Sequence, residues 1–135
     1  MALGQFVLHR FSGDETYRLR SATIRLDSDN GQLRLTFAVS TEEGAIQTQA
    51  DTASHPTAPN AEVTVLLDTF GKEELVGNGF SIPSGYDENL EEYVAIIYYY
   101  EHQELDNNTV EVLNRNGDLF RVRWTGTTRD VNVYD

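Results

Sequence analysis

The side chains in this chain that could do chemistry are mainly carboxylates, and most of them lie in one segment. Residues 41–111 contain fifteen Asp and Glu and a single base, Lys72. Residues 1–40 and 112–135 each carry one more arginine than acids, so the three segments contribute +1, −14 and +1 to the net charge of −12. A carboxylate pair held about 5–10 Å apart can hydrolyse a glycosidic bond if one member has a raised pKa. These acids fall mostly in predicted loops, which favours a solvated surface instead.

An acidic surface can also attract a basic partner, because long-range attraction speeds encounter without requiring particular side chains. We therefore predict a binding surface in the middle segment. Its candidate residues are Glu88, Glu91, Glu92, Glu101 and Glu104, with Tyr86 and Tyr99 as aromatic anchors. The sequence contains no zinc-protease, serine-hydrolase or phosphate-loop motif, so it favours a binding protein over an enzyme.

The run Asp27-Ser-Asp29-Asn-Gly31 looks like half of a calcium loop. An EF-hand needs a bidentate glutamate at its twelfth position, and counting from Asp27 puts Ala38 there. A tight hairpin turn explains every residue of the run, because Asp, Asn and Gly have the backbone preferences that such a turn needs. Asp27 and Asp29 are therefore weak candidates for Ca²⁺, and we expect no other metal or cofactor.

Tyr98, Tyr99 and Tyr100, with Tyr93 shortly before them, form the most distinctive aromatic cluster. Such rings would suit an exposed platform for a sugar or a protein, and they would equally suit a core strand whose hydroxyls emerge at the sheet edge. The neighbouring Ile and Val residues favour the core strand.

Alternation of apolar and polar residues predicts antiparallel strands as the elements that position these groups. Tyr17–Leu26 and Gln32–Thr41 form one expected hairpin, which turns at Asn30-Gly31. The phase of the first strand slips by one residue, which predicts a bulge near Ser21. Seven of the nine arginines fall in predicted strands, where we expect them to pair with acids and hold acidic loops against the sheet.

The C-terminal part repeats this pattern, with Thr109–Leu113 and Phe120–Thr125 on either side of Asn116-Gly117. Further strands are expected at Phe6–Phe11, Glu62–Thr69, Val94–Tyr100 and Val131–Tyr134.

Two segments interrupt the alternation and are predicted to be loops, Asp51–Asn60 and Gly77–Glu92. Ser84 and Asp87 form a capping signature that predicts one helical turn over Tyr86–Glu92. We therefore predict a single all-β domain over residues 1–135. Its expected fold is an antiparallel β-sandwich of about eight short strands, with a flattened β-barrel as the alternative.

Composition narrows the class of protein. The chain has no cysteine, which excludes disulfides and thiolate chemistry. Its negative charge disfavours nucleic acid and anionic lipid as partners. The N-terminal residues lack a signal-peptide pattern and the longest apolar run, Val94 to Tyr100, is too short to span a membrane, so we expect a cytoplasmic protein.

Three functions remain open from the sequence. The first is a non-enzymatic binding or accessory protein that presents the acidic, tyrosine-containing surface to a protein partner, which would be basic. The second is a Ca²⁺-assisted carbohydrate-binding module or glycan-active enzyme. The third is a structural subunit of a homo-oligomer, with edge strands or the tyrosine strand at the interface.

Overall fold

The computed structural model describes residues 4–10, 13–29, 31–42, 47–48, 58–67, 76–99, 101–117 and 119–128. Within these ranges the chain is all-β, as predicted, and contains no helix. The strands are β1 (Gln5–Arg10), β2 (Gly13–Asp29), β3 (Gln32–Thr41), β4 (Gln47–Thr48), β5 (Asn60–Leu67), β6 (Gly79–Ile82), β7 (Tyr86–Asp87), β8 (Glu92–Tyr93), β9 (Ala95–Tyr99), β10 (Glu101–Glu104), β11 (Asp106–Asn116) and β12 (Leu119–Thr127).

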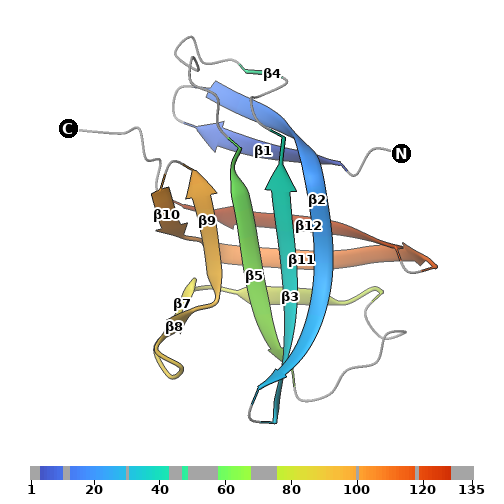
Figure 1. Cartoon of the computed structure of the whole chain (residues 1–135), viewed down its shortest axis with the longest axis vertical. Coiled ribbons are helices and arrows are strands. Elements are labelled where there is room, and N and C mark those ends of the chain that lie inside the picture. The colour runs from blue at the N-terminus through green and yellow to red at the C-terminus, as the bar shows by residue number, and fades with distance from the viewer. Residues whose placement is uncertain are drawn as a thin grey trace.

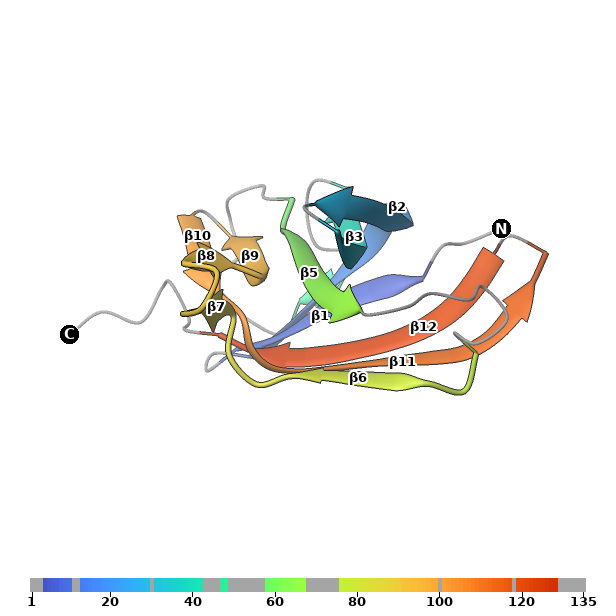
Figure 2. The same ribbon diagram turned by 90° about the horizontal axis from the view of Figure 1, so that it is seen from below.

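The described strands form a main sheet, a smaller second sheet and a separate hairpin. The main sheet has the order β1-β2-β3-β5-β9-β10, with β4 also paired to β2. The second sheet has the order β12-β11-β6 and crosses behind β3, β5 and β9 (Figure 1). Seen from below, the main sheet curls over the second one (Figure 2). The curled antiparallel sheets make a half-barrel, which is compatible with both the predicted sandwich and the flattened barrel.

Both predicted hairpins are present. Asp29 of β2 pairs with Gln32 of β3, and Gly31 in the turn between them has a φ of 81°. In the second hairpin Asn116 is already paired with Leu119, so the turn lies one residue later than predicted and begins at Gly117, whose φ is 65°. Positive φ values of this kind favour glycine, which explains why both turns carry one.

The predicted bulge near Ser21 is confirmed. Leu19 pairs with Thr41 and Ser21 pairs with Ser40, so Arg20 is the extra residue on β2. The bulge changes which residues of β2 face the interior, from Glu15 and Tyr17 before it to Ile24 after it. The strand also changes partners close to the bulge, because residues up to Arg18 pair with β1 and β4 and residues from Leu19 onward pair with β3. A bulge bends and twists a strand, so this one helps the sheet to curl.

The core lies between the two sheets. Alternate residues of β3, β5 and β9 pack with Val110 and Val112 of β11. Leu105, between β10 and β11, is buried in the same cluster. The buried members are Leu35, Phe37, Ala61, Val63, Ala95, Ile97, Leu105, Val110 and Val112. Strand β9 lies between β5 and β10 in the sheet, so the prediction of a core strand is confirmed for its position, although only one of its faces is fully buried. Its residues alternate between buried and half-buried positions.

The prediction for Gly77–Glu92 is wrong in two respects. Part of this segment is strand β6, which pairs with β11, because Phe80 and Ile82 alternate toward the core. Residues 86–92 belong to the β7–β8 hairpin rather than to a helical turn. Glu91 has a φ of 55°, which a right-handed helix cannot accommodate, and Asp87 Oδ1 accepts a hydrogen bond from Leu90 N–H at 3.0 Å within the turn. The capping signature therefore marks a turn.

Two other predictions fall largely outside the described residues. The strand expected at Val131–Tyr134 lies wholly outside them, and the loop expected at Asp51–Asn60 is described only at residues 58–60, where Asn60 begins β5.

A buried carboxylate joins distant parts of the main sheet. Glu15 on β2 is fully buried, and its Oε1 accepts hydrogen bonds of 2.8 Å from both the Tyr17 and the Tyr99 hydroxyls. Tyr99 lies 84 residues further along the chain, on β9. Phe6 and Leu8 of β1 pack against the two tyrosines. Burial raises the pKa of the Tyr17 hydroxyl far above its usual value, and the hydrogen bond with Glu15 raises it further.

This arrangement predicts that stability falls in alkaline solution. Above the ordinary tyrosine pKa of 10.0 the unfolded chain releases the Tyr17 proton while the folded chain retains it, so the free energy of unfolding decreases as pH rises. We expect Tyr17→Phe to flatten this decrease in urea titrations between pH 9 and 11. The same variant should lose about 1–3 kcal/mol at pH 7, because Glu15 loses a donor. Tyr93→Phe, at a position 61 % exposed, is the matched control. An unchanged alkaline slope in Tyr17→Phe would contradict the assignment.

Candidate functional site

The β7–β8 hairpin brings together four of the predicted binding residues, Tyr86, Glu88, Glu91 and Glu92. Its two strands pair Tyr86 with Tyr93, whose rings meet edge to face at 5.0 Å, and Asp87 with Glu92. With the Asp87–Leu90 hydrogen bond in the turn, these contacts give the hairpin a defined shape. We call residues 86–93 the acidic hairpin.

The base of the acidic hairpin is anchored at Gly85. Its carbonyl oxygen accepts hydrogen bonds from Val94 N–H at 2.7 Å and Ala95 N–H at 3.2 Å, and its own N–H donates to Asp106 Oδ1 at 2.8 Å. A Cβ atom at this position would lie 2.6 Å from the carbonyl oxygens of Ala95 and Leu105. Glycine is therefore the residue that allows the hairpin to join the sheet here.

An ion pair holds the other side of the acidic hairpin. Arg34 Nη1 of β3 lies 2.6 Å from Glu92 Oε1, with the two side chains 22 % and 41 % exposed. The Glu92 carboxylate is therefore already paired with an arginine of the same chain, and this ion pair fixes the hairpin to the main sheet. The pairing of strand arginines with acids was predicted, and it also occurs between Arg18 and Glu42 and between Arg25 and Asp27.

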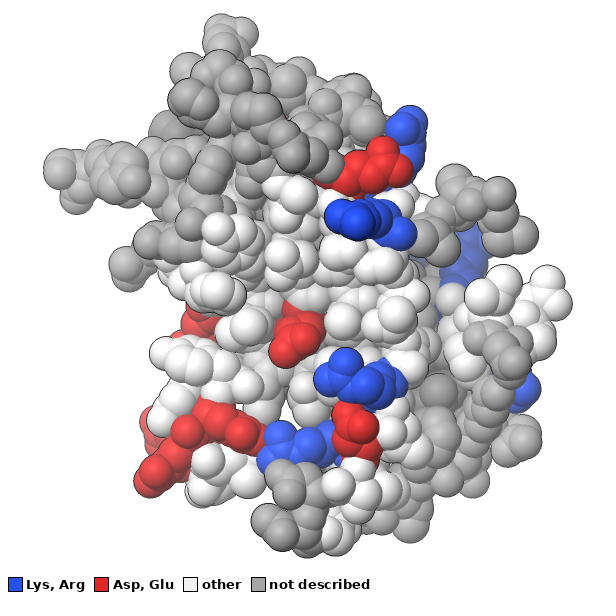
Figure 3. Space-filling view, in the orientation of Figure 1, with Lys and Arg blue, Asp and Glu red and all other residues white. Residues whose placement is uncertain are grey.

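Two of the remaining acids of the hairpin, Glu88 and Glu91, face outward, whereas Asp87 accepts the Leu90 hydrogen bond within the turn. Glu88 and Glu91 are exposed and Asp87 is half-buried, and none of them forms an ion pair within the described ranges. Exposed apolar surface lies next to them at Leu90 and Tyr93. Figure 3 shows red residues gathered at the corner where Figure 1 places β7 and β8, while on the other described parts of this face most red residues lie next to blue ones.

Glu104 and Asp106 form a coupled carboxyl pair at the base of the hairpin. The hydrogen bond with Asp106, followed by burial and the nearby negative charge, raises the pKa of Glu104. Hydrogen bonds from Glu104 and from Gly85 N–H lower the pKa of Asp106. When the pair holds a single proton, Glu104 is therefore the member that carries it. Direct hydrogen bonding places the two groups closer than the roughly 5 Å that glycoside hydrolysis requires. Ser84 Oγ also donates to Glu104 Oε2 at 3.4 Å.

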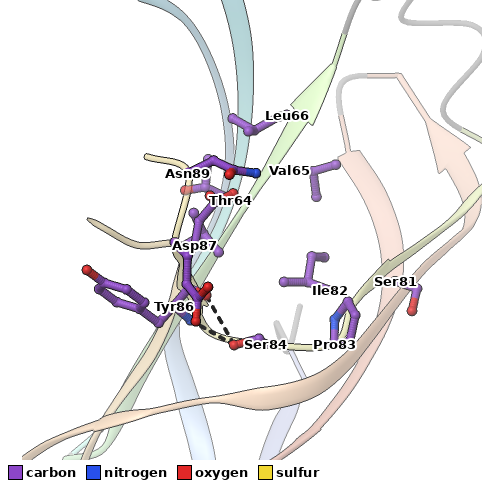
Figure 4. Close-up of a pocket in the computed structure, with 12 residues that line it drawn as sticks. Thr64, Val65, Leu66, Ser81, Ile82, Pro83, Ser84, Tyr86, Asp87 and Asn89 are labelled. Atoms are coloured by element: carbon purple, nitrogen blue, oxygen red, sulfur yellow. Dashed lines mark hydrogen bonds between the residues drawn. The ribbon is translucent and has the colours of Figure 1, made fainter. Parts of the chain in front are cut away.

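A pocket of about 410 Å³ lies between the acidic hairpin, strand β5 and the end of β6. In Figure 4, Val65 and Ile82 lie across it from Asp87 and Asn89, and Pro83 and Ser84 form its lower edge. Its wall thus combines aliphatic side chains, hydroxyls and carboxylates. A volume of this size is within the range of ligand and peptide side-chain sites.

The structure separates the other predicted site residues from this region. Tyr99 is only 7 % exposed and donates its hydroxyl to Glu15, so it is a core residue and not a surface anchor. Glu101 lies in β10, and its side chain is outside the described part, as is that of Asp29. Asp27 accepts a hydrogen bond from Arg25 Nε at 2.8 Å. Among the described residues there is no group of three or more His, Cys, Asp or Glu placed to hold a metal, and calcium binding stays a prediction.

Sequence reasoning missed the groups that shape the site from a distance, Glu15, Arg34, Gly85 and Asp106. Glu15 lies two residues before Tyr17 on β2, so both side chains are on the same face of the strand. This spacing was the available signal that Glu15 faces inward. No local signal pointed to the partners of Arg34 or Asp106, because these lie on elements far away in the sequence.

Comparison of the chain with protein-family models, with curated proteins and with solved structures finds no match. In the part of the chain that the structure describes, no helix is long and apolar enough to cross a membrane.

The anchoring of the hairpin predicts that Gly85→Ala is destabilising. The added Cβ would meet two backbone oxygens that cannot move independently of the sheet, so we expect a loss of about 1–3 kcal/mol in urea unfolding. Gly79→Ala is the matched control, because a Cβ there would make only ordinary contacts at 3.8 Å or more. Equal effects of the two substitutions would show that Gly85 is not a tight position.

The carboxyl pair predicts an opposite effect of pH on stability at its two members. The folded chain keeps the Glu104 proton where the unfolded chain has released it, so the free energy of unfolding falls as pH rises from 4.5 through the raised pKa. The lowered pKa of Asp106 has the opposite consequence: as pH falls below 3.8, the unfolded chain takes up this proton before the folded chain does, so the free energy of unfolding falls. We expect the melting temperature of Glu104→Gln, relative to that of the native protein, to increase as pH rises from 4 to 8, because glutamine does not release a proton. A constant difference across that range would contradict the shared proton.

Proposed function

We propose that this protein is a non-enzymatic binding protein that docks a basic protein segment on its acidic hairpin. The observation that carries the proposal is that some acids pair with arginines of the chain while those of the hairpin turn do not, within the described part of the chain. Arginines of the main sheet pair with Glu42, Asp27 and Glu92, whereas Asp87, Glu88 and Glu91 project from an anchored hairpin without a paired cation in the described ranges.

Anchoring favours such a role because a surface that is already ordered loses little entropy on binding. The edge-to-face tyrosines, the Arg34–Glu92 ion pair and the hydrogen bonds at Gly85 together hold the hairpin before a partner arrives. Exposed Leu90 and Tyr93 add apolar area next to the carboxylates, a combination typical of protein-recognition surfaces.

Charge supports a basic partner rather than an anionic one. With a net charge of −12, the field of the molecule speeds the approach of cationic segments and repels nucleic acid and anionic lipid. The cytoplasm is the compartment that we propose, from composition alone.

The proposal is tested with a synthetic dodecapeptide of alternating lysine and glycine, titrated by calorimetry at 50 mM and 500 mM salt. We expect binding that weakens at least tenfold at the higher salt, because counter-ions screen the attraction. At low salt, Glu88→Gln/Glu91→Gln should weaken binding about tenfold.

The matched control is Glu62→Gln/Glu111→Gln, which removes the same charge from exposed positions outside the hairpin. It should change affinity by less than twofold. Equal losses in both double variants would show attraction by net charge without a site, and salt-independent binding would contradict an electrostatic surface.

A further inference from the structure

The pocket beneath the acidic hairpin exposes an edge of β5 with which no described strand pairs. Strand β5 pairs along its whole length with β3, but its pairing with β9 ends at Val63–Ala95. One more hydrogen bond follows, from Thr64 N–H to Val94 O at 2.7 Å, and the chain before Val94 then departs into the hairpin. In a strand, residues two apart turn their backbone groups to the same edge. The N–H and C=O of Leu66 therefore point toward the place that β9 has vacated, and no described strand pairs with them there.

The opposite wall of the pocket is a second edge. Strand β6 is the last strand of the order β12-β11-β6, so only one of its sides is paired among the described strands. Its end contributes Ile82 to the pocket, facing Val65 of β5 (Figure 4). These two side chains pack against the core, so they form a fixed apolar floor between the two edges.

Natural proteins usually cover or blunt an open edge, because it recruits other strands. Here the acidic hairpin covers one side of the edge and leaves a recess lined by Asp87 and Glu88. We infer that the pocket takes an extended basic peptide segment. This segment adds to β5 at Leu66, in continuation of β9, and places a lysine or arginine beside Asp87 and Glu88.

Each part of the recess matches one feature of that occupant. The N–H and C=O of Leu66, which no described strand pairs on this side, complement a peptide backbone. The aliphatic floor accepts an apolar side chain, and the carboxylates select a cationic one. Charge complementarity also disfavours a second copy of this chain, whose net charge is −12. The inference rests on the proposed function for its basic partner, and it adds the strand-like mode of recognition.

The test uses a capped hexapeptide of alternating valine and lysine, and the same peptide with alternate backbone amides N-methylated. Methylation removes the hydrogen bonds of a strand edge and keeps the charge, so we expect about tenfold weaker binding of the methylated peptide. In hydrogen exchange, the Leu66 amide should become protected when the unmodified peptide binds. The Leu67 amide, which faces β3, is the internal reference and should not change.

A substitution at the mouth of the pocket supplies an independent check. Asn89 is an exposed turn residue that points toward Val65, so Asn89→Trp should fill the recess without disturbing the core (Figure 4). We expect at least tenfold weaker binding of the hexapeptide in Asn89→Trp, an unchanged affinity in Asn89→Ala, and unchanged melting temperatures in both.

The outcomes separate this inference from the proposed function. Equal affinity for both peptides, without protection of Leu66, would overturn strand addition and leave an electrostatic surface. Binding of neither peptide would overturn both. Protection of Leu66 that rises with protein concentration in the absence of peptide would assign the edge to a second copy and overturn the inference.

Discussion

A fully buried carboxylate must find hydrogen-bond donors within the protein, and the way Glu15 does so organises the rest of this fold. Its donors are the hydroxyls of Tyr17 on the same strand and Tyr99 on β9. For Tyr99 to reach Glu15, the main sheet has to curl until β9 approaches the beginning of β2. The bulge at Arg20 contributes the bend, and the apolar residues that this curvature encloses become the core.

The path of the chain around the acidic hairpin depends on the same curl. Strand β9 ends its pairing with β5 at Ala95 because the chain before it turns outward at Val94 and Gly85. That departure produces both the projecting hairpin and the recess under it. The ion pair between Arg34 and Glu92 then holds the hairpin against the sheet. The surface that we propose for binding is thus a consequence of where one strand stops.

Much of the β-structure could be predicted from the sequence, and particular residues show why. The phase slip between Leu19 and Ala22 correctly located the bulge, since one extra residue must change the face on which later side chains lie. The glycines at 31 and 117 marked hairpin turns because their positive φ values suit them. Strand β6 was missed because only two apolar residues, Phe80 and Ile82, alternate in it. The glycine before them and the proline after them are typical of a loop. Ser84 and Asp87 suggested a helix because the same side chains that cap a helix also cap a turn.

The candidate site was predictable only in part, for a different reason. Tyr86, Glu88, Glu91 and Glu92 were expected to act together and do lie in one hairpin, because they are close neighbours in the chain. Tyr99 was named as a candidate surface anchor although its strand was predicted to belong to the core, and its burial could not be predicted because its partner Glu15 is far away in the sequence. The sequence by itself determined the strands, the turns and the bulge, since these follow from side-chain periodicity and local backbone preference. Only the tertiary structure decided which acids are paired, which tyrosine is buried and where β5 has an edge that no described strand pairs, because these depend on contacts that the curled sheet makes between distant segments.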